Sequence, residues 1–427
     1  MKNWSENIKW HPGELLYPEN ENEIIDIIKR AKREKKNIRP IGSGHSFTPL
    51  CATEDISLSL DKMQAVQTAD EEHMAIAEAG IKLKKLGDSL LELGLAQENL
   101  GDINVQSLAG AISTGTHGTG TQFGSVSSQL TEISFINGKG ELHHVSAASD
   151  PDLFRCLQVN LGVLGIITRA KIRCIPAYNL HLIKKKERVE SVLQNLEKYN
   201  AENRNFEFYW FPHTPYAQCK FSNTITETGK ERSAFYTWFH DIFLENHMLE
   251  LISAGSRQFP SLTPFLSRLT AAFVGEEEKI KSAHNVFATV RNVKFTETEY
   301  SVPMEHYKTV MQEIIRAFEK AKYPINFPVE NRFVAADEPY LSTSYGRPSA
   351  YIACHAYKGV DNTRYFADME EIFQHYEGRP HWGKMHNCSS TYLQKQYAQW
   401  DKFMAIREEH DPEGIFLSPY MKKLLGL

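Results

Sequence analysis

The first third of the chain alternates between two spacings of apolar residues. Apolar side chains at helical spacing predict a helix over residues 21–31, directly after a turn signal at Pro18. Strict alternation of apolar and polar residues predicts strands at residues 56–60 and 74–79, because successive side chains of a strand point to opposite faces. A short apolar run at residues 37–41 adds a further strand.

The same mixture continues up to Pro176. Leucines at helical spacing predict a helix over residues 83–93, ending near Gly94. Residues 152–160 are expected to form a helix and residues 165–174 a strand. The sequence therefore predicts an α+β fold with short sheets.

After Pro176 the composition changes, and the chain is rich in aromatic residues up to about Pro380. The charge run at residues 184–188 is typical of a solvated edge rather than a binding patch. Residues 233–252 are amphipathic and aromatic, which favours a core helix over a helix that binds a partner or a membrane surface.

Composition narrows the class of protein. Of 427 residues, 41% are hydrophobic and 24% charged, as in soluble globular proteins, and a formal charge of −5 gives no reason to expect nucleic acid as a partner. No run of about 18 apolar residues predicts a membrane span, and the first residues lack a signal peptide's apolar run. Six scattered cysteines without a C-x-x-C pair fit unpaired thiols in a cytoplasmic protein better than disulfides or a metal site.

Glycine is distributed unevenly. Fifteen of the 25 glycines lie between Gly42 and Gly165, so this part of the chain is built around tightly bent backbone. Within it, residues 103–131 contain no Asp, Glu, Lys or Arg. An uncharged, glycine-rich stretch fits backbone packed against a bound molecule, and it fits a buried loop with purely structural turns equally well.

The sharpest local signal is the octapeptide Arg39-Pro40-Ile41-Gly42-Ser43-Gly44-His45-Ser46. Its small residues follow a strand and allow successive N–H groups to converge on phosphate oxygens. A P-loop would need Gly-Lys-Ser/Thr here, and the dinucleotide fingerprint would need a third glycine where Phe47 stands. His45 could act as a base or a nucleophile, or could simply hydrogen-bond the loop.

This octapeptide resembles the flavin-attachment loop of the vanillyl-alcohol oxidase superfamily, and the resemblance is closest to the sugar-1,4-lactone oxidases (gulonolactone and arabinonolactone oxidases) and the alditol oxidases. It extends over nearly the whole chain. It implies that the loop amides bind the FAD diphosphate and that His45 is bonded covalently to the 8α carbon of the flavin. It also implies a PCMH-type FAD-binding domain made of two subdomains.

Two further blocks are similar to FAD-binding segments of this superfamily. Residues 110–120 resemble the loop that wraps the diphosphate and the edge of the isoalloxazine, and residues 161–168 resemble the segment at the adenine end, where Ile166 is expected to bind through its backbone. The resemblance assigns cofactor contacts to Arg39, Ile41, Gly42, Ser43, Gly44, His45, Ser46, Gly110, Ser113, Thr114, Gly115, His117, Gly118, Gly120, Gly165, Ile166 and Lys384.

The second half of the chain carries residues similar to the family's catalytic signatures. Glu330 and Arg332 stand at positions i and i+2 of an expected strand, so both side chains share one face. Without the resemblance, this pair would be taken for a surface ion pair. The resemblance assigns catalytic roles to Glu330, Arg332, His355 and Lys384, with His355 on the same sheet as Arg332. Tyr357 departs from the alditol oxidases, in which a threonine is expected.

The resemblance implies an FAD-binding domain at residues 1–176, a substrate or cap domain with an antiparallel sheet flanked by helices at residues 177–380, and a segment at residues 381–427 that returns to the flavin. The implied activity is FAD-dependent oxidation of an alcohol CH–OH of a sugar-1,4-lactone, with dioxygen as acceptor and hydrogen peroxide as product. An alditol oxidase, a lactone dehydrogenase with another acceptor, and a non-catalytic flavin-binding protein are the alternatives. The oligomeric state is left open.

Overall fold

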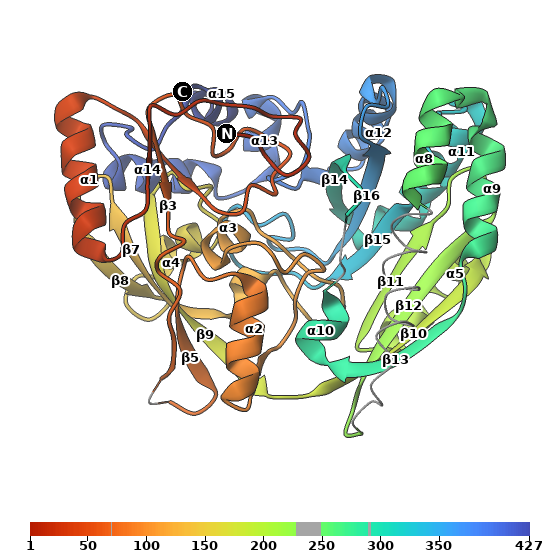
Figure 1. Ribbon diagram of the computed structural model, residues 1–427, viewed down its shortest axis with the longest axis horizontal. Coiled ribbons are helices and arrows are strands. Elements are labelled where there is room, and N and C mark those ends of the chain that lie inside the picture. The colour runs from red at the N-terminus through yellow and green to blue at the C-terminus, as the bar shows by residue number, and fades with distance from the viewer. Residues whose placement is uncertain (70, 228–248, 289–291) are drawn as a thin grey trace.

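A computed structural model describes residues 1–69, 71–227, 249–288 and 292–427 (Figure 1). Its sheets fall into two groups. A three-stranded parallel sheet and a six-stranded antiparallel sheet lie within the first 176 residues, and an eight-stranded antiparallel sheet, which we call the cap sheet, is built from later residues. The expected helix at residues 233–252 lies outside the described residues except for its last four positions.

The parallel sheet has the order β1-β3-β2, with β1 Glu14–Leu16, β2 Ile38–Ile41 and β3 Ile56–Ser59. Helix α1, Glu21–Glu34, connects β1 to β2. The helix begins where the Asn20 side chain accepts the Glu23 N–H, and it buries Ile24, Ile28 and Ala31 on one face. The elements predicted at residues 21–31, 37–41 and 56–60 are therefore present, and the helix is longer than expected.

The six-stranded sheet has the order β4-β5-β9-β7-β8, and β6 pairs with β9. Its strands are β4 Val66–Thr68, β5 Met74–Glu78, β6 Leu95–Gln97, β7 Leu130–Asn137, β8 Leu142–Ser146 and β9 Gly165–Pro176. The helical elements of this part are α2 Leu83–Glu92, α3 Leu108–Ser113, η1 Val126–Gln129 and α4 Pro151–Gln158. Helices α2 and α4 and strands β5 and β9 match the predicted elements within a few residues.

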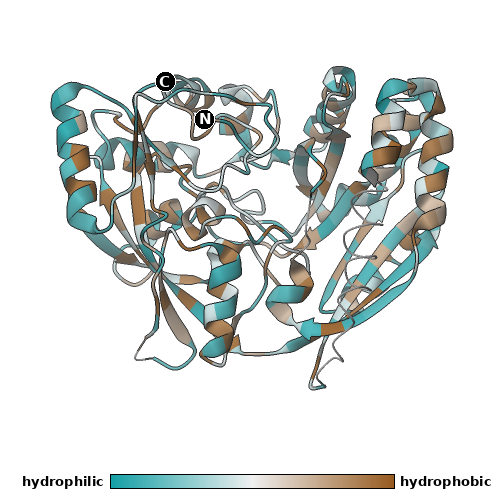
Figure 2. Cartoon of the chain, in the orientation of Figure 1, coloured by the Kyte–Doolittle hydropathy of each residue, from teal (hydrophilic) through white to brown (hydrophobic). Residues whose placement is uncertain are grey.

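The cap sheet has the order β13-β10-β12-β11-β15-β16-β14-β17. Its strands are β10 Asn179–Arg188, β11 Asn205–Trp210, β12 Tyr216–Ile225, β13 Glu277–Ser282, β14 Phe295–Pro303, β15 Val329–Val334, β16 Ser349–Tyr357 and β17 Arg379–Pro380. Figure 2 shows β13 as hydrophilic except at Ile280, whereas polar and apolar residues alternate over the first residues of β10. One face packs on an apolar core with helices α11 and α12, and the other face lines the site described below.

The helices around the cap sheet are α5 Val189–Gln194, α6 Leu196–Glu202, α8 Leu249–Gln258, η3 Pro260–Leu262, α9 Thr263–Phe273, α10 Ala283–Phe287, η4 Met304–His306, α11 Tyr307–Ala321 and α12 Thr363–His375. The charge run at residues 184–188 lies on β10. It is not fully solvated as expected, because Lys184 is buried and forms a 2.8 Å ion pair with Glu277 of β13.

The end of the chain returns to the first core. Helices α13 Ser390–Gln396, α14 Trp400–His410 and α15 Pro419–Leu425 contribute apolar side chains to the cluster that holds the sheets of the first 176 residues. The Ile38 N–H of β2 donates to the Ile415 carbonyl at 2.7 Å. Figure 1 accordingly shows the N and C labels close together above the first part of the molecule. Among the described helices, none is both long and apolar enough to cross a bilayer.

Candidate active site

One wall of the site is the loop after β2. Residues 39–46 line a narrow cavity together with Ser107, Gly110, Ser113 and Thr114 from the start and end of α3. Among the described residues, no protein acceptor takes up the backbone N–H groups of residues 43–46. A Cβ added at Gly42 would lie 2.3 Å from Ser107 Oγ, so only glycine allows this approach. Free N–H groups facing a tight cavity fit the diphosphate of FAD.

Arg39 has a different position from the one expected for a cofactor ligand. Its guanidinium is buried and donates to the carbonyls of Leu50, Leu161, Gly162 and Phe416 at 2.6–2.8 Å. Burial lowers its pKa to about 10, still well above neutrality. The Arg39 side chain therefore connects the loop after β2 to Leu161 and Gly162 before β9 and to Phe416 near the end of the chain. These bonds stabilise the shape of the cavity.

The other predicted cofactor residues divide into two sets. His117 and Gly118 line the main pocket, and a Cβ on Gly118 would meet the Leu100 carbonyl oxygen at 2.2 Å. Four predicted residues line neither cavity: Gly115, Gly120, Gly165 and Ile166. Ile166 is buried in the first core on β9, and Gly165 holds φ +159° against the Ile136 carbonyl. The structure thus brings the first two blocks to the cavities. Of the third block, Leu161 and Gly162 line the narrow cavity, whereas Gly165 and Ile166 line neither cavity.

His45 faces both cavities, as do Ser43 and Ser46. Burial, together with the positive charges of Lys384 and Lys82, lowers the pKa of His45 to about 4. The imidazole is therefore neutral at pH 7. A neutral ring retains the nitrogen lone pair that a nucleophile requires.

The opposite wall is one face of the cap sheet, and strand register builds it. Directly paired residues of neighbouring strands point to the same face. Arg332 of β15 lies between Glu207 of β11 and Tyr351 of β16. The next row places Tyr209, Glu330, Ala353 and Glu299 side by side, and the row after it places His355 beside Glu297. Glu330, Arg332, His355, Glu297 and Glu299 all line the main pocket from this face.

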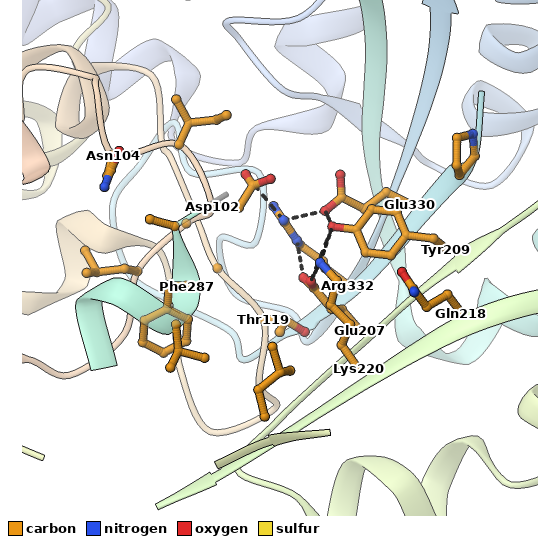
Figure 3. Close-up of a pocket in the computed structure, with 18 of the residues that line it drawn as sticks. Asp102, Asn104, Thr119, Glu207, Tyr209, Gln218, Lys220, Phe287, Glu330 and Arg332 are labelled. Carbon is orange, nitrogen blue, oxygen red and sulfur yellow. Dashed lines mark hydrogen bonds and ion pairs between the residues drawn. The ribbon is translucent and has the colours of Figure 1, made fainter. Parts of the chain in front are cut away.

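Arg332 is the centre of a buried charge network (Figure 3). Its Nε lies 2.8 Å from Glu207 Oε2, and its Nη2 contacts Glu330 Oε1 and lies 3.4 Å from Asp102 Oδ1. Burial opposes the charge, but the three carboxylates raise the pKa of Arg332 further above its ordinary value. Glu330 and Arg332 are only 4% and 6% exposed, so the surface ion pair that the pattern alone favoured is wrong.

Two neighbours complete this network. Tyr209 donates its hydroxyl to Glu330 Oε1 at 2.6 Å. Lys220 Nζ lies 2.9 Å from Glu207 Oε1. Burial raises the pKa of Glu207, but Lys220 and Arg332 outweigh it and bring that pKa to about 2. The carboxylate is therefore ionised throughout the physiological range.

His355 and Arg332 lie on the same sheet, as predicted, and His355 points to the same face. Its Nδ1 lies 3.0 Å from the Pro328 carbonyl, which can only accept, so Nδ1 carries a proton. Nε2 lies 3.5 Å from Glu297 Oε1 and 3.8 Å from Glu330 Oε2. In a neutral ring the lone pair is therefore on Nε2, which faces the pocket.

Lys384 reaches the same face from the segment after β17. Its Nζ lies 2.6 Å from Glu297 Oε2 and 5.3 Å from the Phe47 ring centroid. Burial opposes its charge, but Glu297 and Glu299 raise its pKa above the ordinary value. The Phe47 N–H donates to the Gly383 carbonyl at 2.7 Å. This bond ties the Lys384 segment to the His45 loop, so the two walls meet here.

A cluster of His117, Glu299 and His381 has the spacing of a metal site. The hydrogen bonds favour a proton-sharing cluster instead. His381 Nδ1 accepts the Gly383 N–H at 3.1 Å, so its Nε2 carries the ring proton and is not available to a metal. His117 donates Nδ1–H to the Gly118 carbonyl and places Nε2 3.3 Å from Glu299. Despite burial, His117, Lys384 and His381 hold the Glu299 pKa well below its usual range.

Sequence reasoning did not single out the acids that balance these cations. Asp102, Glu207, Glu297 and Glu299 all line the pocket. One signal could have revealed Glu207, because it is the lone charge in the apolar run Phe206 to Phe211. Glu297 and Glu299 repeat the i, i+2 spacing of Glu330 and Arg332, and Asp102 has no such signal.

Comparison with known proteins identifies the family of this chain. The model of the D-arabinono-1,4-lactone oxidase family matches residues 170–424, and that of an FAD binding domain matches residues 12–146. L-gulono-1,4-lactone dehydrogenase of Mycobacterium tuberculosis (strain ATCC 25618 / H37Rv) is 35% identical over 99% of this chain and 98% of its own. L-gulonolactone oxidase of Mus musculus is 30% identical over 99% of this chain and 98% of its own.

Among solved structures, a solvent-stable cholesterol oxidase superposes with a TM-score of 0.85 at 19% identity, covering 100% of this chain and 97% of that chain. Identity this low shows the fold alone, and this likeness confirms the predicted α+β fold. The family match spans more than half of the sequence, from the end of the first part through the tail. The chain belongs to the D-arabinono-1,4-lactone oxidase family of FAD-dependent sugar-1,4-lactone oxidoreductases.

Proposed function

We propose that the protein oxidises an alcohol CH–OH of a sugar-1,4-lactone. The observation that carries this proposal is the common face shared by Glu330, Arg332, His355 and Lys384, opposite the loop that carries His45. When bound, FAD would supply the redox chemistry: it would take up the hydride of the substrate carbon at N5, and its electrons would pass to dioxygen to give hydrogen peroxide. The relatives' names span oxidase and dehydrogenase, and dioxygen is the acceptor that we propose.

His355 is the proposed base. Its Nε2 faces the pocket with Nδ1 fixed to the Pro328 carbonyl, so the ring is held in the tautomer that can accept a hydroxyl proton. Glu297 and Glu330 beside Nε2 stabilise the imidazolium that forms. The substrate hydroxyl thus loses its proton to His355 while its carbon loses hydride.

Arg332 and Lys384 supply the positive charge at this face. Arg332 binds a substrate oxygen, and its three carboxylate contacts hold the guanidinium in one orientation. Lys384 stabilises negative charge that develops on the reduced ring system. Both charges are fixed before the substrate arrives, so little reorganisation opposes the reaction.

FAD is held, in this proposal, by the free N–H groups of residues 43–46 and by the narrow cavity between the first loop and α3. His45 attaches to the flavin 8α carbon. In this attachment an N–C bond would replace one N–H and one C–H bond, and the two protons and two electrons released would pass to dioxygen as hydrogen peroxide. Domain boundaries at residues 176 and 380, with the remaining tail returning to the FAD-binding part, agree with the two groups of sheets.

One position departs from the alditol oxidases and supports a lactone over an open-chain alditol as the proposed substrate. Tyr357 stacks on Phe327 at 6.2 Å, and Arg257 lies 5.5 Å from its ring centroid. A large, fixed ring stands where an alditol oxidase is expected to have a threonine. We also propose a cytoplasmic location, since all six cysteines are unpaired thiols.

Anaerobic reduction of the bound flavin tests the proposal. Sugar-1,4-lactones should bleach the 450 nm absorbance, and alditols should do so far more slowly. Admission of air should then restore the absorbance and release one peroxide per flavin. Bleaching by alditols alone would overturn the substrate class, and reoxidation only by a quinone or cytochrome would overturn dioxygen as acceptor.

A further inference from the structure

A small hairpin at the start of the described chain packs directly on the His45 loop. Lys2 and Lys9 form an antiparallel bridge that closes the hairpin. The Trp4 N–H donates to the Gly44 carbonyl at 2.7 Å. A Cβ on Gly44 would lie 3.7 Å from Asn3 Cα, so the two backbones are in van der Waals contact. We call residues 2–9 the N-terminal hairpin.

Side-chain amides extend this attachment along the loop. Asn3 Nδ2 donates to the Ser46 carbonyl at 2.9 Å, and Asn7 Nδ2 donates to the Phe47 carbonyl at 3.1 Å. Asn3 is buried, and its Nδ2 also donates to Asn7 Oδ1 at 2.5 Å. The hairpin therefore holds three carbonyls of residues 44–47, on either side of His45, and restricts the loop to one backbone conformation.

Trp4 contacts the histidine ring itself. Its indole stacks on His45 with a centroid distance of 5.5 Å and an interplanar angle of 21°. The other neighbours of the indole are Phe47, edge-on at 6.5 Å, and Phe295, edge-on at 5.2 Å. Trp4 is thus wedged between the His45 loop and β14 of the cap sheet, and its plane determines which rotamers the imidazole can adopt.

The far side of the hairpin is fixed to the cap sheet. The Glu6 carboxylate contacts Lys294, directly before β14, and Lys358, directly after β16. Lys2 lies 2.8 Å from the same carboxylate, and together the lysines lower the pKa of Glu6 far below its usual range. The hairpin is therefore anchored to both walls of the site.

We propose that the N-terminal hairpin is the device that orients His45 for covalent attachment of the flavin, with Trp4 as the positioning residue. The inference rests on the proposed attachment through His45. To form the bond, the attacking nitrogen of His45 must point its lone pair at the flavin carbon. A side chain that holds the imidazole in this orientation increases the rate of attachment without taking part in the reaction itself. Trp4 fixes the ring plane, the amides fix the loop backbone, and Glu6 fixes the hairpin against the cap sheet.

The test compares Trp4→Ala, Trp4→Phe and Trp10→Ala with the wild type. Each holoprotein is denatured, and flavin on the polypeptide is quantified by fluorescence against flavin released into acid supernatant. Trp4→Ala should bind FAD yet lose covalent flavin by about tenfold, because the imidazole is no longer oriented. Trp4→Phe, which retains an aromatic plane, should keep at least half of the covalent flavin.

Trp10→Ala is the matched control, since Trp10 is a buried tryptophan next to the hairpin for which no ring contact with His45 occurs in the described part of the chain. It should destabilise the protein without changing the covalent fraction of bound flavin. Equal covalent fractions in Trp4→Ala and wild type would overturn the inference alone. A wild type without covalent flavin would overturn the proposed attachment itself, so the two failures are distinguishable.

Should Trp4→Ala fail to fold, Glu6→Ala gives the same decision, because the partly buried Glu6 carboxylate contacts lysines of the hairpin and of the cap sheet rather than the His45 ring. It should slow attachment after FAD is added to flavin-free protein by about twofold to fivefold, since only the anchor to the cap sheet is lost. An unchanged rate of attachment in Glu6→Ala would overturn the inference.

Discussion

The two walls of the site consist of different chemical groups. The loop wall uses backbone N–H groups and glycines, and residues 103–131 beside it carry no charge. The cap wall uses side chains, and Arg332, Lys220 and Lys384 are each paired with buried carboxylates. The first wall is therefore sensitive to added volume and the second to removed charge. The difference suits a large constant cofactor on one side and proton and charge movements on the other.

Removing the central charge of the cap wall should have the largest effect. In Arg332→Met, Asp102, Glu207 and Glu330 lose their shared cation, so we expect about 3–5 kcal/mol lower stability. The rate of anaerobic flavin reduction by lactone should fall by about 10³-fold or more, because the substrate oxygen loses its positive partner. Denaturant unfolding and stopped-flow absorbance measure the two effects.

Arg155→Met is the matched control, since Arg155 forms an exposed 2.8 Å ion pair with Glu338. Its stability should change by no more than about 0.5 kcal/mol, and its reduction rate should not change. Equal effects of the two substitutions would show that the cap wall does not depend on its buried charges.

The loop wall should respond to a single added methyl group. In Gly118→Ala the new Cβ would lie 2.2 Å from the Leu100 carbonyl oxygen, and neither backbone can move freely. We expect a loss of about 2–3 kcal/mol and a lower flavin content in the purified protein. In Gly275→Ala, where the structure shows nothing within 4 Å of the new Cβ, both should stay at wild-type values. Normal stability and flavin content in Gly118→Ala would contradict a backbone-built wall.

Lys384 connects the two walls, and its removal should have an intermediate effect on rate. Lys384→Met leaves Glu297 without its 2.6 Å partner but retains the aliphatic stem over Phe47. Flavin reduction should slow by about 10²-fold, because one of the fixed positive charges of the cap wall is lost. Lys62→Met removes an exposed lysine that is paired with Glu19 and does not line the pocket, and the flavin of this variant should be reduced at the wild-type rate. A reduction rate within twofold of wild type for Lys384→Met would remove this residue from the mechanism.

The residues of the two walls could be predicted from the sequence to different extents. The loop wall could be predicted in detail, because glycines and small residues that allow close backbone approach are visible in the sequence at Gly42, Gly44 and Gly118. The cap wall could be predicted only at Glu330, Arg332, His355 and Lys384. Their partners depend on register between strands far apart in the chain: Glu207 reaches Arg332 only because β11 pairs with β15. Local pattern contains no information on such a pairing.

Arg39 and Trp4 illustrate the same limit within the loop wall. Arg39 stands in the loop motif, yet its guanidinium contacts carbonyls from three distant segments. Trp4 lies outside every recognised motif, yet its ring stacks on His45. A motif identifies residues near a ligand, whereas the tertiary fold decides which of them touch it and which hold the others in place.

The smallest predicted effect concerns pH and His381, where the two walls meet. Burial lowers the His381 pKa to about 3, whereas the same histidine in the unfolded chain has a pKa of about 6.5. Between these values the unfolded state binds one proton more than the folded state, so stability falls as pH drops below 6.5 and is unaffected by this group at higher pH. The contribution to the slope is about 1.4 kcal/mol per pH unit. His381→Asn should reduce the slope of unfolding free energy against pH by that amount between pH 5 and 6, and leave the slope above pH 7.5 unchanged. If His381→Asn leaves the slope of unfolding free energy against pH unchanged below pH 6, His381 is protonated in the folded protein. The cluster of His381 with Glu299 would then be a charged pair, like those of the cap wall, and not a neutral contact of the loop wall.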